Sequence, residues 1–305
     1  MLIPIGDNID KKSLPILPGV LLFANLAVFI FQMRLIFENP TTIKPALDFI
    51  DAWGLVPEDL ADGRFIGLFT HMFLHGGFSH IIGNMIVLWA FSCSLENGLG
   101  TATLTLFYVL WGLAAGMLHA AMEWGSDIPL VGASGAIAGL MGAYTVLYGA
   151  DAKIKTVFFF FFKFWTVNVP AFLYGGAWFY LQLWNSTLDD GEGGGVAWYA
   201  HIGGFAAGAV TAVIVRNQLD IQLVKDRDGT LTFKNTAEDE KEKFLIEGDR
   251  YEFAEHDVAG DGSSLPDDCP YCTASLEEHH RITPGVARCG NPECGRFVYA
   301  GAVLV

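Results

Sequence analysis

Residues 65–95 read FIGLFTHMFLHGGFSHIIGNMIVLWAFSCSL, a run of 31 residues that contains no Asp, Glu, Lys or Arg. An α-helix needs only about 20 apolar residues to cross the hydrocarbon core of a bilayer. The run still includes His80 and Asn84, and strongly polar side chains are costly inside a membrane unless they are paired or face water. The stretch therefore predicts a membrane-spanning helix whose polar residues have a function.

Five more windows without Asp, Glu, Lys or Arg are long enough to span a membrane: residues 13–33, 97–122, 128–150, 164–188 and 193–215. Only 17% of the chain is charged while 52% is hydrophobic, and a formal charge of −15 provides no basic surface for nucleic acid. We therefore expect an all-α, multi-pass membrane domain of six spanning helices over residues 1–216, surrounded by the lipid bilayer and without a nucleic-acid partner.

The basic residues predict how these helices are oriented. They gather before the first helix, between the fourth and fifth, and after the sixth, at Lys11, Lys12, Lys153, Lys155, Lys163, Arg216, Lys225 and Arg227. Loops rich in Lys and Arg stay on the cytoplasmic side. Both termini are therefore expected in the cytoplasm, with the domain in the cell membrane. The first apolar window is too long for a cleavable signal peptide.

Polar residues near the starts of the second, fourth and sixth helices are expected at one depth, just below the outer surface. They are His80 and Asn84, then Ser134, then His201. A hydroxyl, an imidazole base and hydrogen-bond donors for an oxyanion are the groups that acyl transfer requires. Taken singly, each residue is as easily structural, because a serine in a helix often bonds only a backbone carbonyl.

The chain resembles the rhomboid family of intramembrane serine proteases in several separate motifs. The spacing of His71, His75, His80 and Asn84 is similar to the second-helix signature of that family. Residues 132–135, GASG, resemble its G-x-S-G nucleophile motif. Residues 200–208, AHIGGFAAG, resemble its sixth-helix motif, and residues 95–100, LENGLG, fit the Glu and Gly that close the second helix.

The resemblance implies a six-helix rhomboid-like bundle that cleaves single-span or membrane-anchored protein substrates near the outer membrane face. Ser134 would be the nucleophile and His201 its general base and later acid, with no cofactor for catalysis. His80, Asn84 and the backbone N–H of Ser134 would form the oxyanion hole, and the loss of one donor is expected to lower the rate roughly 10²–10³-fold. The alternative is a catalytically silent rhomboid-like protein that binds membrane-protein clients.

Two positions depart from the family pattern. Ile66-Gly67 replaces a Trp-Arg pair, and Ala138 stands where an aromatic residue often packs on the catalytic imidazole. Either His201 is oriented less firmly, or a Phe or Tyr from elsewhere fills this gap. His71 and His75, four residues apart, could suggest a metal pair, but no Glu lies between them and we favour a structural role.

The end of the chain has the composition of a soluble segment, with 18 acidic and 9 basic residues after Arg216. Residues 217–263 are predicted to be an acidic linker with a hairpin between Ile221 and Phe233 and a helix. Residues 264–305 resemble a zinc ribbon, because Cys269, Cys272, Cys289 and Cys294 form two close pairs that suit a closed tetrahedral Zn²⁺ site. Disulfides are the alternative, although a cytoplasmic tail would keep thiols reduced. We expect a structural Zn²⁺ ion and a cytoplasmic protein partner for this module.

Overall fold

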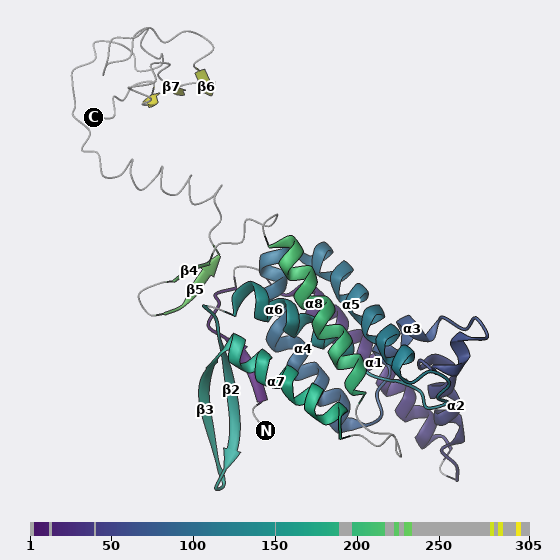
Figure 1. Cartoon of the computed structure of the whole chain (residues 1–305). Coiled ribbons are helices and arrows are strands. Elements are labelled where there is room, and N and C mark those ends of the chain that lie inside the picture. The colour runs from purple at the N-terminus through teal and green to yellow at the C-terminus, as the bar shows by residue number, and fades with distance from the viewer. Residues whose placement is uncertain are drawn as a thin grey trace, which may run out of the picture. The chain divides into compact units, whose positions relative to one another are not determined.

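The computed structural model describes residues 3–11, 14–39, 41–149, 151–188, 197–216, 223–225 and 229–233, together with strands between residues 281 and 299. The chain divides into two units, residues 1–234 and 235–305, and Figure 1 shows the helices gathered in the first. The α-helices are α1 Ile16–Phe37, α2 Lys44–Trp53, α3 Gly67–Thr70, α4 Phe78–Leu99, α5 Thr101–Met122, α6 Ser134–Tyr148, α7 Ala171–Ser186 and α8 Trp198–Val215. Two 3₁₀ turns, η1 Glu58–Leu60 and η2 His71–Phe73, lie in the first loop.

Four helices among the described residues, α1, α4, α5 and α8, are long and apolar enough to cross a membrane. Each of the six apolar windows contains one of the longer helices, but α6 has 15 residues and α7 has 16. The chain is thus a mostly helical membrane protein, and the count of six spanning helices stays a prediction.

Two of these windows are only partly helical. Residues 65–77 precede the second helix, because the short α3 and η2 turns lead to Gly76-Gly77 and α4 begins at Phe78, in agreement with the placement of His80 and Asn84 near its start. The window 164–188 is only partly helical, since residues 164–170 form a strand and α7 starts after Pro170. Proline suits a helix start because it has no N–H to donate to a preceding turn.

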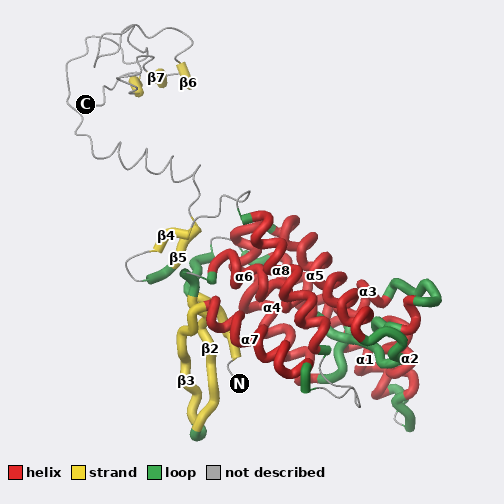
Figure 2. The backbone as a smooth tube through the Cα atoms, in the orientation of Figure 1, coloured by secondary structure: helices red, strands yellow, loops and turns green. Residues whose placement is uncertain are grey.

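The membrane unit is also not all-α. It contains a three-stranded antiparallel sheet of β1 Ile3–Asp7, β2 Lys153–Phe160 and β3 Lys163–Pro170, with β2 in the middle. The run of phenylalanines at residues 158–162, between the fourth and fifth windows, thus forms part of a β-hairpin. Figure 2 shows this hairpin as a yellow arm that projects away from the helices.

The turn of the hairpin is unusual in its residues. Phe161 and Phe162 occupy the two-residue loop between β2 and β3, and both have positive φ, 47° and 59°. Tight hairpin loops with two positive φ values strongly prefer Asn-Gly or similar pairs. The left-handed conformation costs a bulky residue about 1–2 kcal/mol, so this turn holds its aromatic pair at the expense of stability.

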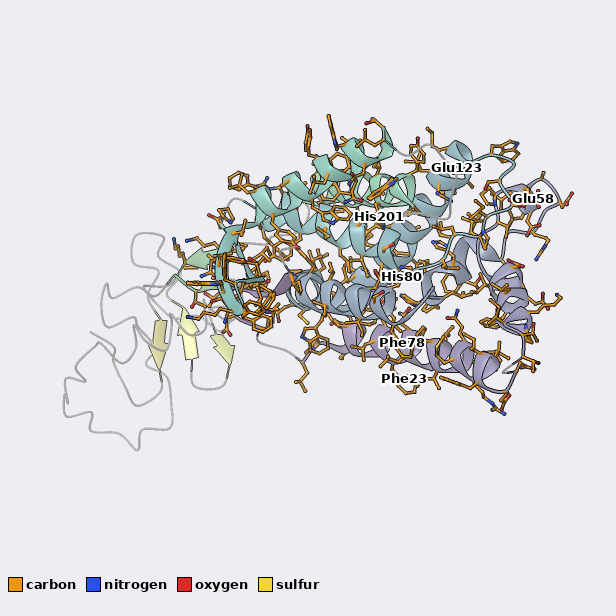
Figure 3. All side chains as sticks on the ribbon, turned by 90° about the horizontal axis from the view of Figure 1, so that it is seen from below. Phe23, Glu58, Phe78, His80, Glu123 and His201 are labelled. Atoms are coloured by element: carbon orange, nitrogen blue, oxygen red, sulfur yellow. The ribbon has the colours of Figure 1, made fainter. Side chains whose placement is uncertain are left out.

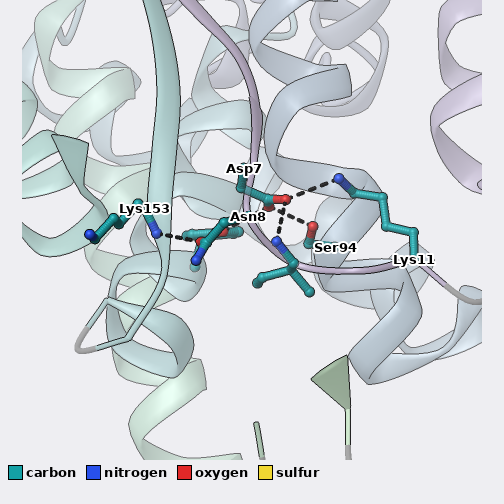
Figure 4. A network of polar contacts seen from close by, with 7 residues as sticks. Asp7, Asn8, Lys11, Ser94 and Lys153 are labelled. Carbon is teal, nitrogen blue, oxygen red and sulfur yellow. Dashed lines mark hydrogen bonds and ion pairs between the residues drawn. The ribbon is translucent and has the colours of Figure 1, made fainter. Parts of the chain in front are cut away.

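The N-terminal strand is fastened to the helices by a buried carboxylate. Asp7, whose side chain is fully buried, accepts hydrogen bonds from Ser94 Oγ at 2.6 Å and Tyr144 Oη at 2.8 Å, and forms an ion pair with Lys11 at 3.0 Å (Figure 4). A second buried acid, Glu96, accepts the backbone N–H of Leu17 at the start of α1 at 3.0 Å. These contacts tie β1 and α1 to α4 and α6 at one end of the bundle.

Glycines allow α8 to pack directly on the backbone of α6. A Cβ atom at Gly204 would collide with the carbonyl oxygen of Gly135, and one at Gly208 with that of Gly139. Gly204 and Gly208 are four residues apart, in the G-x-x-x-G spacing that lets helix backbones approach closely in lipid, and only hydrogen atoms separate the two helices there. This contact fixes the position of the start of α8 relative to the start of α6.

The membrane unit continues beyond Arg216. The strands β4 Leu223–Lys225 and β5 Leu231–Phe233 form an antiparallel pair at the place of the expected hairpin. Leu231 is buried, and its backbone exchanges hydrogen bonds with Asn8 and Asp10. The compact unit therefore extends to Lys234, past the residue at which the composition changes.

The second unit contains a three-stranded antiparallel sheet, β6 Arg281–Thr283, β7 Val286–Arg288 and β8 Phe297–Tyr299. The four predicted zinc ligands Cys269, Cys272, Cys289 and Cys294 lie outside the described residues. The zinc ribbon therefore remains a prediction from the sequence.

Candidate functional site: a serine and a histidine between α6 and α8

The structure brings Ser134 and His201 together. Ser134 is the first residue of α6 and His201 lies in the first turn of α8, and Ser134 Oγ is 2.8 Å from His201 Nε2. The close backbone contact between Gly204 and Gly135, each near one of these residues, explains why two helices can share so short a hydrogen bond. Figure 3 shows His201 and His80 inside the bundle, toward the end that carries Glu123.

A third residue, Gln182 of α7, fixes the tautomer of the His201 imidazole. Its Oε1 lies 2.8 Å from His201 Nδ1, and its Nε2 donates to the carbonyl of Trp178 at 3.3 Å. Because the amide nitrogen is engaged by a carbonyl, the oxygen must face the histidine, and Nδ1 must be the donor. The neutral ring then has its lone pair on Nε2, where it can accept the Ser134 proton.

Two tryptophans contact His201, Trp178 of α7 and Trp198 of α8, and the ring of Trp198 lies 6.4 Å from the imidazole at an angle of 87°. The ring of Trp178 lies 5.6 Å from the imidazole at an angle of 42°. The aromatic rings against the imidazole are thus tryptophans and not the Phe or Tyr that was one of the two alternatives. Trp178 and Gln182 lie four residues apart, so one face of α7 both packs on the imidazole and binds it.

Gln182 was missed in the sequence, although it could have been found. It lies in the uncharged window 164–188, and the cost of a polar side chain in a membrane applies to it as it does to His80 and Asn84. An amide gives no chemical hint of its own, however, because glutamine is rarely a nucleophile or base. Its partner became visible only when α7 was placed against α8.

His80 and Asn84 lie one turn apart on α4 and both face Gly132, two residues before Ser134. A Cβ at Gly132 would lie 2.7 Å from His80 Nε2 and 3.6 Å from Asn84 Nδ2. Glycine, with a φ of 127°, therefore leaves a small space beside these two nitrogen atoms. The nearby N-terminus of α6 contributes backbone N–H groups that have no partner within the helix.

His80 and Asn84 each keep one N–H donor that can point into this space after their hydrogen bonds to other residues are made. Gly76 donates its backbone N–H to His80 Nδ1 at 3.4 Å, so a neutral ring has its proton on Nε2, the atom that faces Gly132. Asn84 Nδ2 is 2.9 Å from His75 Nε2. An amide NH₂ carries two hydrogens, so one can bind His75 while the other remains for a ligand.

His75 supports Asn84 and does not form part of a metal site with other described residues. Burial, and secondarily the neighbouring His80, lower the pKa of His75 to about 4, so the ring is neutral near pH 7 and can accept from the amide. Gln32 of α1 holds the backbone of His75 on both sides, by bonds of 3.1 and 3.2 Å. His71 bonds the carbonyl of Gly67 at 2.9 Å. These contacts favour the structural role for both histidines.

The fold and the site thus define a helical membrane protein with a hydroxyl–imidazole pair between two helices, in which the imidazole is buried and the serine is half-buried. Residues 62–218 match the family model described as "Rhomboid domain". This match covers more than half of the chain, which therefore belongs to the rhomboid family.

Individual relatives agree with this assignment. The chain is 33% identical over 124 residues to RHOMBOID-like protein 5 of Arabidopsis thaliana, a match that covers 40% of this chain and 39% of the relative. It is 28% identical over 172 residues to "Rhomboid protein 1, mitochondrial" of Saccharomyces cerevisiae, covering 53% and 45%. It is 30% identical over 100 residues to rhomboid protease GluP of Bacillus subtilis, covering 32% and 19%. The chain thus spans less than half of the length of these relatives.

Proposed function

We propose that this protein is an intramembrane serine endopeptidase in which Ser134 and His201 form a catalytic dyad. The observation that carries the proposal is the continuous hydrogen-bonded row Ser134–His201–Gln182, in which the amide of Gln182 sets the tautomer that a general base needs. One relative is named a rhomboid protease, which supports the same reading. The substrates would be single-span or membrane-anchored proteins.

The geometry suits an acyl-transfer sequence. Ser134 Oγ attacks the carbonyl carbon of the scissile peptide bond while its proton passes to His201 Nε2. The protonated imidazole then gives that proton to the leaving nitrogen as the C–N bond breaks. A water molecule, deprotonated by the same Nε2, hydrolyses the acyl-enzyme and restores Ser134. The reaction needs no cofactor.

The negative charge of each tetrahedral intermediate would lie in the space beside Gly132. His80 Nε2 and the second hydrogen of Asn84 Nδ2 are donors fixed before the substrate arrives, as are the N–H groups at the start of α6. Donors that need no reorganisation stabilise the transition state more than they stabilise the flatter ground-state carbonyl. His75 and Gln32 would act as positioning residues for Asn84.

The test of the proposal is cleavage of a single-span reporter by the full chain in lipid vesicles, with labelling by a serine-directed fluorophosphonate as the second readout. A protease cuts the reporter and labels at Ser134. A silent protein that binds clients would retain the reporter uncut and take no label, although it could share every helix contact described above. Mass spectrometry of the fragments also locates the cut relative to the membrane.

Gln182 is expected to be a positioning residue. Replacing it by leucine removes the acceptor of the Nδ1–H group of His201, so the imidazole would populate the wrong tautomer. The kcat of the Gln182→Leu variant should therefore fall about 10–100-fold, while its KM changes little. Gln182→Glu keeps an acceptor oxygen at nearly the same place and should retain most of the activity. If both variants lose activity equally, or if only KM changes, the amide acts by packing alone.

We further propose that the protein sits in the cell membrane with both termini in the cytoplasm, so that the site opens toward the outside. The distribution of lysine and arginine supports this orientation. In this orientation α6 and α8 begin near the outer side of the membrane, where the dyad lies, and end on the cytoplasmic side.

We also propose that residues 264–305 bind one structural Zn²⁺ through Cys269, Cys272, Cys289 and Cys294 and provide a surface for a cytoplasmic protein. In the sequence, the second cysteine pair falls between the residues of β7 and those of β8. Metal analysis of the purified full chain should give about one zinc per chain. Cys272→Ser with Cys289→Ser should lose it, whereas Cys93→Ser should not. Zinc that remains in the double variant would contradict the assignment.

A further inference from the structure

The tip of the β2–β3 hairpin exposes an unusual amount of aromatic surface. Phe162 is 92% exposed, Phe161 79% and Phe164 77%, and Phe159 and Trp165 beside them are more than half exposed. A few scattered apolar residues on a surface need no explanation, but a contiguous aromatic group does. The turn also holds its two phenylalanines with positive φ, where Asn-Gly would fit without strain. A strained conformation retained at an exposed site points to a function of these side chains.

The remainder of the hairpin identifies the kind of surface that would cover this tip. Lys153, Lys155 and Lys163 are exposed, and the only acidic residue from 151 to 170 is Asp151. Aromatic side chains combined with lysines are typical of the boundary between acyl chains and anionic headgroups. A protein partner would more often be met by a mixed set of charges and hydrogen-bonding groups around an apolar centre.

The position of the hairpin in the chain places it at this boundary. It leaves the bundle at the end of α6 and returns at the start of α7, at the same end as the start of α1 and the end of α8. Eight residues of strand extend roughly 25 Å, and Figure 1 shows the arm projecting beyond the helices. The tip thus lies outside the outline of the helices in this view, and the arm starts at the end of the bundle where α6 ends and α7 begins.

We propose that the β2–β3 hairpin is a lipid-binding arm. The aromatic tip, residues 159–165, inserts into the interfacial region of the leaflet on the lysine-rich side, and the lysines bind anionic headgroups. The arm gives the protein a second contact with the bilayer, separate from its spanning helices and independent of the protease function. Its strand β2 also pairs with β1, so the arm would hold the N-terminal strand at the membrane surface.

The arm can be tested with an environment-sensitive fluorescent amino acid in place of Phe162, in the full chain reconstituted into phosphatidylcholine–phosphatidylglycerol vesicles. Lipids brominated on their acyl chains should quench the probe at least about twofold, and aqueous iodide should quench it weakly. The same probe in place of Ile30, which is 66% exposed on α1, gives the fully lipid-facing reference. The probe in place of Asp62, in an exposed turn, gives the aqueous reference.

The outcomes separate the possible surroundings of the tip. Quenching by iodide and not by bromolipid would show the tip in water and overturn the proposal. Protection from both quenchers would show that a protein, such as a second copy, covers the tip, and would overturn it equally. If bromolipid quenches the probe in place of Phe162 as strongly as the probe in place of Ile30, the result supports insertion of the tip.

A second variant tests whether the tip itself inserts. Phe161→Asn with Phe162→Gly replaces the strained pair by the residues that such turns prefer, so the hairpin should form at least as well while losing its two most exposed rings. With the probe now in place of Phe164, bromolipid quenching should fall at least about twofold relative to the chain with both phenylalanines. Unchanged quenching would mean that the tip is not the anchor.

Discussion

Ser134→Ala should abolish cleavage of a single-span reporter, with a loss of roughly 10⁴–10⁶-fold in kcat, because no other described group near His201 Nε2 can attack the carbonyl. The same variant should take up no fluorophosphonate. It should also keep the melting temperature of the parent within about 4 °C, since it removes one hydroxyl from the start of a helix that glycine contacts hold in place.

The matched control is Ser92→Ala. Ser92 is a buried serine of α4 whose Oγ donates to the carbonyl of Leu88 at 2.6 Å, a bond within its own helix. Its loss should leave cleavage within about twofold of the parent, because such backbone bonds do little more than satisfy the hydroxyl. Retained activity in Ser134→Ala would exclude this serine as nucleophile and leave the client-binding alternative or another nucleophile.

The parts of the fold that the sequence predicted are those governed by the cost of charge in lipid. Charge-free windows located the long helices because a single lysine or aspartate inside the membrane would be expensive. The same cost made Ser134, His201, His80 and Asn84 conspicuous before any helix was placed. Their placement at one depth followed from the directions of the second, fourth and sixth helices alone.

The parts that the sequence did not reveal depend on contacts between distant segments. The hairpin was overlooked because its turn is Phe161-Phe162, without the Gly, Asn or Asp that normally marks a tight loop. Pairing with β1, more than 140 residues earlier, helps to hold it in the strand conformation. Trp178 and Gln182 escaped notice for the same reason, since their roles arise only when α7 packs on α8. The role of a glutamine depends on the residue that it contacts in the fold, whereas the G-x-S-G motif indicates the role of its serine directly from the sequence.

His201→Ala should be as damaging as the loss of the serine. Without Nε2 nothing accepts the Ser134 proton or returns it to the leaving nitrogen, so kcat should again fall roughly 10⁴–10⁶-fold. Fluorophosphonate labelling should slow in parallel, because the reagent also needs an activated oxygen. Reporter binding, measured by co-purification, should persist, since the residue is buried behind the site.

The combined variants make this prediction specific to a dyad. If Ser134 and His201 act as one unit, Ser134→Ala with His201→Ala should be no slower than either alone, because each single change already removes the whole pathway. Gln182→Leu should likewise have no effect on activity once His201 is absent, whereas it should slow the parent. Additive losses would mean that Gln182 acts on the substrate or the fold independently of the imidazole. The double-mutant cycle thus tests whether the 2.8 Å contacts on both sides of His201 form one functional row.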